Sequence, residues 1–340
     1  MSSKIALVTG ISGFIGAHVA RELVEQGFTV RGTVRSQEKA DQVRQILTPY
    51  IKLENKTAAL EFAIVKDISK PGAFDQAVVG IDYVLHVASP FHYNTNDPEK
   101  DLIIPAVQGT VEILKSVVEF GKSVKRVVVT SSVAAIRTLN LADPDGLSEL
   151  DWNEAAIEQF NLHGKNTPPG IAYSASKTLA EKAAWNFIKE NTPSFDLVTI
   201  NPPFVFGPTI HPVADIESLN TSVKLIADFY TNKTQETNPA IAAGFVDVRD
   251  LARAHALAAV NPKASGERFL VSGGPFTHQL LVETLEVKFP ERVYAAAGTS
   301  NVPVRELNGK SKEVLGVGEY IPFEQSIVDT VKSLQQRFGV

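Results

Sequence analysis

The stretch Thr9-Gly10-Ile11-Ser12-Gly13-Phe14-Ile15-Gly16 decides how the first part of this chain folds. It follows the short apolar run 5–9, which is typical of a buried strand. It leads into residues 14–26, where apolar side chains recur with the spacing of one helix face. The sequence therefore predicts a strand, a tight glycine turn and a helix in succession.

Each glycine of this turn has a physical role. Gly10 permits the tight turn, Gly13 lets the backbone approach a pyrophosphate, and Gly16 lets the helix pack closely on the strand. The free N–H groups and the positive dipole end of the helix then favour phosphate. A glycine-rich turn without any ligand is the alternative, but the strand–turn–helix context favours a dinucleotide site. The residues expected to bind there are Gly10, Ile11, Ser12, Gly13, Phe14 and Ile15.

Composition excludes several classes of protein. The chain has 340 residues, 44% of them hydrophobic, so it has enough material for a large core and about two domains. The absence of cysteine excludes disulfides, cysteine-based metal sites and a thiol nucleophile. A net charge of −5 with scattered lysine and arginine argues against a nucleic-acid surface. Because no apolar run approaches ~20 residues and no signal peptide is evident, we expect a cytoplasmic protein without a membrane partner.

Strand-like and helix-like segments alternate through the first half of the chain. The run Val127-Val128-Val129 has no polar alternation, which suits a strand of a parallel sheet covered on both faces. This alternation predicts an α/β fold with a Rossmann-type doubly wound parallel sheet. The expected strands are 5–9, 29–34, 61–66, 82–88, 126–131 and 197–200.

After Phe204 the pattern becomes richer in loops. Residues 242–248 and 268–271 are predicted to be isolated strands, and 323–338 a terminal helix. We expect a smaller α/β substrate-binding domain interleaved with the end of the sheet. The expected division is 1–203 plus about 241–265 for the dinucleotide domain, and 204–240 plus 266–340 for the smaller one.

The end of the second strand indicates which dinucleotide binds. An NAD site usually has an acidic residue there, which accepts a hydrogen bond from the ribose 2′-hydroxyl. This chain instead has Arg35, with Lys39 one helical turn later, and two cations suit a 2′-phosphate. Both residues also fit ordinary solvated positions at a helix start, and nearby Glu38 is expected on a different helical face. The prediction is NADPH/NADP+ rather than NADH.

A tyrosine, a lysine and a serine form a second constellation. Tyr173 and Lys177 are four residues apart, so they lie on the same helix face. The pair alone also fits a surface contact between an aromatic ring and an ammonium group. Its position between two predicted strands favours the edge of the sheet where a cofactor binds, and Ser132 follows the earlier strand at that edge.

These three groups suit proton transfer. A phenol has a pKa near ~10, and a neighbouring ammonium favours the phenolate and lowers that pKa. Tyr173 is then able to protonate a carbonyl oxygen, while the Ser132 hydroxyl supplies a second donor to the same oxygen. Hydride comes from the cofactor.

With these motifs the chain resembles the extended short-chain dehydrogenases/reductases over nearly its whole length. It is most similar to the fungal NADPH-dependent methylglyoxal/isovaleraldehyde reductases, which are relatives of dihydroflavonol reductase and of carbonyl reductases. The matching segments are Thr9–Gly16, Val87–Phe91, Thr130–Ser132, Tyr173–Lys177, Asn201–Pro208 and Phe245–Asp250.

The resemblance implies roles for individual residues. Ser132, Tyr173 and Lys177 would be catalytic, with Lys177 also binding the nicotinamide ribose, and Arg35 and Lys39 would hold the 2′-phosphate. The remaining implied cofactor contacts are Asp67 and Ile68 at the adenine, Pro202 and Val205 toward the nicotinamide, and, without an assigned part of the cofactor, Ala88 and Ser222. One departure is the segment Ala106-Val107-Gln108-Gly109-Thr110, which contains no asparagine, whereas many members of the family have one there; this argues against an asparagine-supported water relay.

Other polar residues are expected to be structural. Asp247, Arg249 and Asp250 suit local pairing at a helix start, and His86 suits a core position. His92 and His211 have no partner spacing that indicates a metal site, so no metal is predicted.

Three apolar residues beside the motifs are expected to line a substrate pocket, although they also suit the core. Such walls favour apolar aldehydes and ketones over sugars or acids. These residues are Phe91, Val133 and Phe204.

Three functions remain in competition. The leading one is NADPH-dependent reduction of a small-molecule carbonyl substrate such as methylglyoxal, isovaleraldehyde or a bulkier prochiral ketone, by a monomer or homodimer. The second is an NAD-dependent sugar-nucleotide epimerase or dehydratase, which often carries an acidic pair where this chain has Val133-Ala134. The third is a non-catalytic NADP-sensing regulator, which would need none of Ser132, Tyr173 and Lys177.

Overall fold

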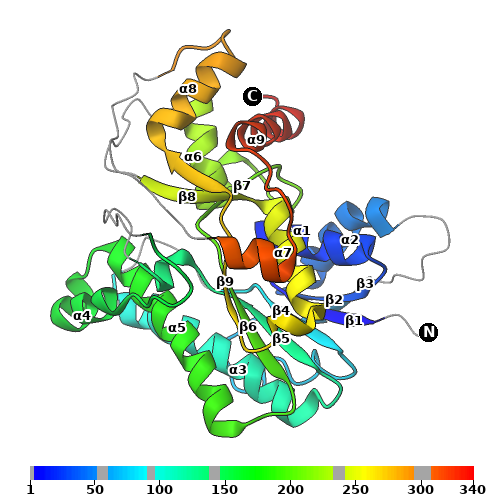
Figure 1. The fold of residues 1–340 in the computed structure, drawn as a ribbon. Coiled ribbons are helices and arrows are strands. Elements are labelled where there is room, and N and C mark those ends of the chain that lie inside the picture. Colours follow the sequence, from blue (N-terminus) through cyan, green and yellow to red (C-terminus); the bar gives the residue numbers. More distant parts are fainter. Residues whose placement is uncertain (1–3, 52–59, 90–95, 138–145, 233–241, 295–307) are drawn as a thin grey trace.

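The computed structural model describes residues 4–51, 60–89, 96–137, 146–232, 242–294 and 308–340 (Figure 1). Within these ranges the strands are β1 (Ile5–Thr9), β2 (Thr29–Val34), β3 (Leu60–Ile64), β4 (Tyr83–His86), β5 (Arg126–Thr130), β6 (Asp196–Asn201), β7 (Phe204–Phe206), β8 (Ala242–Asp247), β9 (Arg268–Leu270) and β10 (Gly274–Thr277).

The α-helices are α1 (Phe14–Glu25), α2 (Gln37–Ile51), α3 (Ile104–Phe120), α4 (Glu154–His163), α5 (Pro169–Asn191), α6 (Thr221–Tyr230), α7 (Val248–Val260), α8 (His278–Lys288) and α9 (Phe323–Phe338). Short 3-10 turns are η2 (Val133–Ala135), η3 (Gly164–Asn166), η4 (Ile216–Ser218) and η5 (Pro262–Ala264), and π-helical turns are η1 (Glu99–Ile103) and η6 (Ser311–Leu315).

The larger sheet has seven strands in the order β3-β2-β1-β4-β5-β6-β9, and every neighbouring pair is parallel. Helices α1, α2 and α7 lie on one face and α3 and α5 on the other (Figure 1). Because helices cover both faces and alternate residues of a strand point to opposite sides, a strand such as β1 contributes to two cores. Ala6 and Val8 join the core under α1, whereas Leu7 joins the core under α3. The predicted doubly wound α/β fold is confirmed.

The smaller sheet has the order β10-β8-β7, with β7 parallel and β10 antiparallel to β8. It lies beside α6, α8 and α9 in the upper part of Figure 1. Its core is largely aromatic: Phe206 and Phe323 each contact the rings of Phe245 and Phe276.

Two short strands differ from the expectation that they are isolated. β8 is the central strand of the smaller sheet, and β9 is the seventh strand of the larger one, paired with β6 through Thr199–Arg268 to Asn201–Leu270. The expected division assigned residues 241–265 to the dinucleotide domain and 266–340 to the smaller one. In the structure β8 belongs to the smaller sheet and β9 to the larger sheet, the reverse of that assignment. Strands of three to six residues carry too little periodicity to indicate their partner, which long-range pairing decides.

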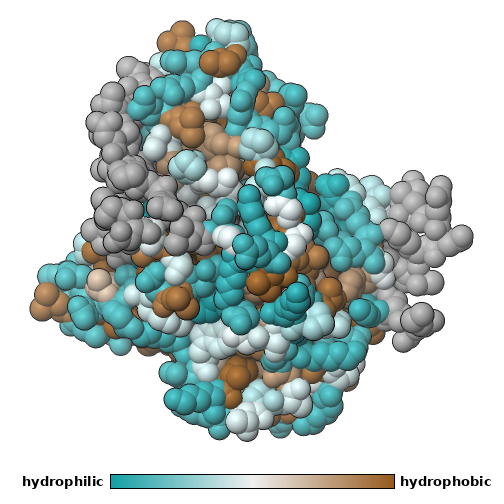
Figure 2. Space-filling view, in the orientation of Figure 1, coloured by the Kyte–Doolittle hydropathy of each residue, from teal (hydrophilic) through white to brown (hydrophobic). Residues whose placement is uncertain are grey.

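The face of the molecule in Figure 2 is largely hydrophilic, and hydrophobic residues appear in small groups between hydrophilic ones. Among the helices of the described residues, none combines the length and apolar character needed to cross a membrane.

Candidate functional site

The turn between β1 and α1 lies where the strand order of the larger sheet changes direction, since β2 and β4 flank β1. Gly10 has φ +67°, and a Cβ there would lie 3.1 Å from the Ala88 Cα. A Cβ on Gly16 would lie 2.3 Å from the Gly10 carbonyl oxygen. The turn is closed by Gly13 N–H, which donates to Gly10 O at 2.9 Å. Glycine is therefore required at Gly10 and Gly16 by backbone contacts.

Two threonines that the sequence reasoning missed hold this turn. The Thr33 Oγ1 accepts from Gly10 N at 3.1 Å. The Thr9 Oγ1 accepts from the backbone of Val87 and Ala88 at 3.1 and 3.0 Å and hydrogen-bonds His86 Nδ1 at 3.0 Å. Both are polar residues at or near the ends of buried strands, and that was the available signal.

Side chains of the glycine turn differ in accessibility. Ile11 is completely buried and packs over Gly32, where a Cβ would lie 2.5 Å from the Ile11 Cδ1. Phe14 is also buried, edge-on to His18 and His211. A ligand contact by Ile11 or Phe14 would therefore come from the backbone, whereas Ser12 and Ile15 are half-buried and Gly13 is exposed.

The first helix begins in a way that suits an anion. Gly13 is its N-cap residue and contributes no side-chain hydrogen bond, and its first turn contains no acidic residue. The N–H groups of the first turn therefore receive no hydrogen bond from an N-cap side chain, and the helix dipole favours negative charge beside them. The glycine cradle and this uncapped end together fit a pyrophosphate.

The two predicted cations lie beside the same edge. Arg35 is exposed just after β2, and Lys39 is half-buried in the first turn of α2, where its Nζ donates to Gln42 Oε1 at 3.0 Å. Glu38 is exposed and accepts from Gln42 Nε2. These positions leave the Arg35 guanidinium accessible to a ligand.

Asp67 and Ile68 follow β3. The pKa of Asp67 is lowered, chiefly because the Ser69 side chain and backbone donate to its carboxylate, with a smaller contribution from the Arg35 charge. Ile68 packs on α3, where a Cβ on Gly109 would lie 2.8 Å from the Ile68 Cδ1.

Ser132 lies at the end of β5, as the N-cap of η2. Its Oγ accepts from Ala134 N at 3.1 Å, and its carbonyl accepts from Asn201 Nδ2 at 3.1 Å. The next residue, Val133, donates its N–H to Pro202 O at 2.9 Å. Ser132 is thus fixed to the end of β6, and within the described residues its hydroxyl hydrogen has no acceptor.

Helix α5 carries Tyr173 and Lys177 and packs against η2 and α3. It begins with Pro169, which is preorganised for the first helical position. Tyr173 is half-buried, whereas Lys177 is buried with 9% exposure. Among the residues that the structure describes, the Lys177 ammonium has no hydrogen-bond partner.

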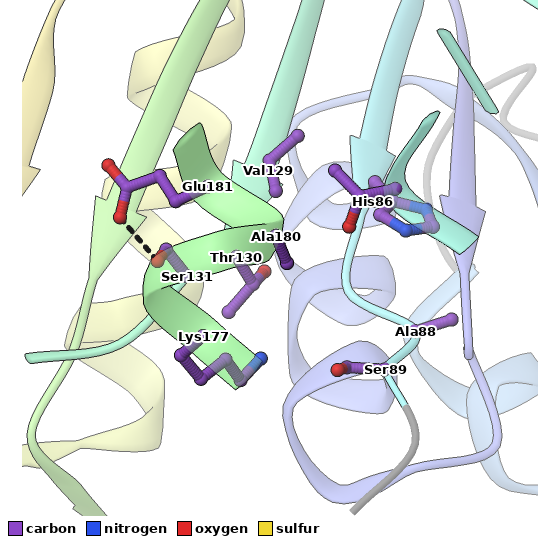
Figure 3. Close-up of a pocket in the computed structure, with 10 residues that line it drawn as sticks. His86, Ala88, Ser89, Val129, Thr130, Ser131, Lys177, Ala180 and Glu181 are labelled. Carbon is purple, nitrogen blue, oxygen red and sulfur yellow. Dashed lines mark hydrogen bonds between the residues drawn. The ribbon is translucent and has the colours of Figure 1, made fainter. Parts of the chain in front are cut away.

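A pocket of about 10 Å³ lies between the ends of β4 and β5 and helix α5, close to the space that one water molecule needs (Figure 3). The Lys177 side chain extends into the region between α5 and Ser89 in this view. The lining residues are His86, Ala88, Ser89, Thr110, Val129, Thr130, Ser131, Lys177, Ala180 and Glu181.

Burial controls the electrostatics of this edge. Desolvation lowers the pKa of Lys177 to about 8, and the negative charge of Glu181 opposes that effect. Burial also lowers the pKa of His86 to about 3, with the Lys177 charge acting in the same direction. His86 is therefore neutral at pH 7, and Lys177 titrates closer to neutrality than an exposed lysine.

Glu181 is a second omission of the sequence reasoning. It lies four residues after Lys177, on the same face of α5, and is completely buried. The spacing of Tyr173, Lys177 and Glu181 along one helix face is the signal that could have identified it.

The other predicted contact residues occupy varied positions. Pro202 and Val205 are buried at the end of β6 and in β7, and Ser222 is half-buried in the first turn of α6. Val133 packs with Ile136 and Leu270, and Phe204 is half-buried against Phe206 and Phe276. Phe91 and His92 lie outside the described residues.

The charged residues near the start of α7 pair locally. Asp247 caps the helix by accepting from Arg249 N at 2.9 Å and forms an ion pair with the Arg249 side chain. Asp250 accepts from Ile321 N at 2.7 Å and pairs with Arg253. No group of three or more histidine and acidic residues that would suit a metal occurs within the described residues.

Comparison with known proteins places this geometry in a family. The family model described as "NAD dependent epimerase/dehydratase family" matches residues 6–272. The chain belongs to this family. Its members of this type are the extended short-chain dehydrogenases/reductases, so the resemblance recognised from the motifs is confirmed.

Relatives within the family include reductases of carbonyl compounds. The chain is 38% identical to a ketoreductase of Aspergillus niger, over 93% of each chain. It is 35% identical to an NADPH-dependent methylglyoxal reductase of Saccharomyces cerevisiae, over 96% of this chain and 97% of the relative. A crystal structure of Gre2 from Candida albicans in complex with NADPH matches with a TM-score of 0.86 and 36% identity, over 98% of this chain and 99% of the other.

Proposed function

We propose that this protein reduces aldehydes and ketones to alcohols with NADPH. The observation that carries the proposal is a pair of unused donors at one edge of the sheet: the Ser132 hydroxyl after β5 and the buried Lys177 ammonium on α5, which packs against η2. Tyr173, one turn before Lys177, supplies the proton. NADPH when bound supplies the hydride that reaches the carbonyl carbon.

The protein's own residues would act as follows. The Ser132 hydroxyl donates to the carbonyl oxygen of the substrate, where negative charge develops. Tyr173 gives its phenolic proton to the same oxygen, and the Lys177 charge stabilises the phenolate that remains. Lys177 also donates to the nicotinamide ribose, and its burial excludes the water that would weaken its electrostatic effect.

The choice of NADPH rests on the end of β2. Arg35 and Lys39 would hold the 2′-phosphate, and Arg35 is accessible for a bidentate contact. The backbone around Gly10–Ile15 and the uncapped start of α1 would hold the pyrophosphate. Asp67, Ile68, Ala88, Pro202, Val205 and Ser222 are proposed as further cofactor contacts.

The substrates proposed are methylglyoxal, isovaleraldehyde or bulkier prochiral ketones. Relatives at 35–38% identity are a methylglyoxal reductase and a ketoreductase, which supports this class. Val133, Phe204 and Phe91 are proposed as pocket walls, and the region of β7, β8 and β10 as the substrate side of the site. An epimerase is disfavoured because Val133 and Ala134 are buried apolar residues where an acidic pair would act.

The decisive experiment replaces Tyr173 by phenylalanine. Tyr173→Phe should lower kcat by about 10²–10⁴-fold because the proton donor is lost, while NADPH affinity stays within a few-fold of the wild type. NADPH consumption with a panel of aldehydes and ketones gives the rate, and NADPH fluorescence gives the affinity.

The matched control is Tyr230→Phe. Tyr230 is buried near the smaller sheet, and its hydroxyl accepts from Gln335 Nε2 at 2.7 Å. This variant loses a hydroxyl without touching the proposed site, so its rate should match the wild type. Native rates in Tyr173→Phe, or a wild type that binds NADPH and turns over no carbonyl compound, would contradict the proposed function.

A further inference from the structure

Glu181 is a buried carboxylate that the proposed chemistry does not use. It has 1% exposure and lies in the middle of α5, one helical turn after Lys177. An isolated charge in such a place would be strongly destabilising, so a buried carboxylate needs donors and a counter-charge. The structure supplies both.

Four donors from three strands and their ends converge on this carboxylate. Its Oε2 accepts from Ser131 Oγ at 2.5 Å and from Asn201 Nδ2 at 2.7 Å. Its Oε1 accepts from Thr199 Oγ1 at 2.9 Å and from Arg268 Nε at 2.6 Å. Figure 3 shows the Ser131 bond and the position of Glu181 above Lys177 on the same helix. Glu181 therefore links α5 to the ends of β5, β6 and β9.

The counter-charge is itself firmly held. Arg268 donates through Nη1 to the carbonyls of Glu149 and Asp151 at 2.5 and 2.8 Å. Its guanidinium carbon also lies 3.7 Å from the centre of the Trp152 ring. Because these contacts fix Arg268, its guanidinium fixes the Glu181 carboxylate in turn.

The network reaches the proposed oxygen-binding serine through one residue. Asn201 donates from the same Nδ2 to Glu181 Oε2 and to the Ser132 carbonyl. Ser131, the neighbour of Ser132, is bound directly to Glu181. The backbone that presents the Ser132 hydroxyl is thus tied to Glu181 on both sides.

The network also reaches Lys177 through charge. Lys177 and Glu181 line the same small pocket, and both are buried, so their attraction is weakly screened. Within the described residues, other titratable groups nearby include Tyr173 one turn before Lys177 on α5, Arg268 from β9, His86 from β4, and His255 from α7, which hydrogen-bonds Thr130 at 2.8 Å. Lys182, the neighbour of Glu181 in sequence, points away and pairs with Glu154 of α4.

We propose that Glu181 is a positioning residue for the carbonyl reduction. Its carboxylate orients the strand ends that present Ser132, and its negative charge keeps the Lys177 ammonium charged inside the protein. The proposal rests on the proposed function, in which Lys177 acts on Tyr173. It extends that function, because it makes Glu181 responsible for the charged state of Lys177, although Glu181 is not among the residues proposed to contact cofactor or substrate.

The test follows Lys177 directly. Protein labelled with ¹³C at the lysine Cε gives a resonance for Lys177, which is assigned by its absence in Lys177→Met. The chemical shift of this resonance reports the protonation of the Lys177 amine. In Glu181→Gln the titration midpoint of this resonance should fall by about one pH unit, a tenfold change in the protonation equilibrium. An unchanged midpoint in a folded Glu181→Gln protein overturns the proposal.

Two further variants separate charge from packing. Glu181→Asp keeps the charge and should leave the midpoint near that of the wild type. Thr199→Val removes one hydrogen bond from Glu181 while conserving the shape of the side chain and the charge, so its midpoint should also be unchanged. A shift in Thr199→Val as large as that in Glu181→Gln would mean that packing sets the midpoint, and would overturn the electrostatic part.

A double variant serves as the control for destabilisation of the fold. Glu181→Gln leaves Arg268 buried without its partner, so Glu181→Gln combined with Arg268→Gln removes both charges together. Its Lys177 midpoint should still be lower than that of the wild type, since Glu181 is the charge that acts on Lys177. A wild-type midpoint in this protein contradicts the proposal.

Turnover adds a separate readout. The basic limb of the kcat/KM profile should move to lower pH in Glu181→Gln and should stay at the same pH in Thr199→Val. If the wild type reduces no carbonyl compound, the proposed function fails, while the Lys177 titration still decides the electrostatic role of Glu181.

Discussion

The carboxyl edge of the larger sheet and the core of the smaller sheet are built from different interactions. At the edge, the buried side chains of Thr9, His86 and Glu181 are held by directional hydrogen bonds, and the buried Lys177 ammonium shares a pocket with the charge of Glu181. In the smaller sheet, ring contacts dominate, as between Phe206 and Phe276, whose centroids are 5.0 Å apart.

This difference has a physical consequence. Hydrogen bonds fix the distance and direction between particular atoms, which a site for hydride and proton transfer requires. Aromatic packing contributes mainly buried area and tolerates changes of shape when volume is conserved. We therefore expect the edge of the larger sheet to determine the chemistry and the smaller sheet to determine stability and the shape of the substrate side.

The largest expected effect compares one buried phenylalanine from each region. Phe276→Ala and Phe74→Ala each remove a completely buried ring, so each should lower the free energy of unfolding by about 3–5 kcal/mol. Phe74 contacts His86, with ring centroids 5.8 Å apart, so only Phe74→Ala should also weaken NADPH binding.

Urea unfolding measures the stability of both variants, and NADPH fluorescence measures the binding. Equal weakening of NADPH binding by both variants would show that the two regions do not act separately.

The next effect concerns the nucleotide end of the larger sheet. Arg35→Ser should lower the preference for NADPH over NADH by about 1.5–3 kcal/mol, since the proposed charge-assisted hydrogen bond to the 2′-phosphate would be lost. The measurement is the ratio of kcat/KM for the two cofactors. Arg44→Ser removes the same charge from α2 at a residue that stacks on Phe62, and its ratio should equal that of the wild type. An unchanged ratio in Arg35→Ser would place the 2′-phosphate elsewhere.

The smallest effect is a pH dependence of stability carried by the larger sheet. Burial lowers the pKa of His86 to about 3 and of His255 to about 4, below the value of about 6.5 in an unfolded chain. When the pH falls below 6.5, the unfolded chain therefore binds protons that the folded protein excludes. The free energy of unfolding should decrease from about pH 6.5 downward by up to ~1.4 kcal/mol per pH unit for each such histidine.

Urea unfolding at several pH values between 7 and 5 measures this slope. His255→Gln should reduce it by the contribution of one histidine, whereas replacement of the exposed His163 by glutamine should leave it unchanged. A slope that is the same in wild type and His255→Gln would contradict the assignment.

Local sequence patterns predicted the elements that depend on backbone conformation and on contacts between residues close in sequence. The glycine turn after β1 follows from the need for φ > 0 at Gly10 and for a close approach at Gly16, and both needs are visible in the sequence. The uninterrupted run Val127–Val129 indicated a buried parallel strand, and the final helix was predicted with its observed bounds, Phe323–Phe338. The family follows from the same motifs.

Tertiary structure decided what depends on partners far apart in the chain. The short strands β8 and β9 gain their identity only from β7, β10 and β6, since three to six residues do not specify a neighbour. The role of Glu181 depends on Ser131, Asn201 and Arg268, which lie 50, 20 and 87 residues away from it. A sequence shows that a carboxylate is present, but only the fold decides that it is buried among donors, because desolvation and hydrogen bonding are properties of the surroundings.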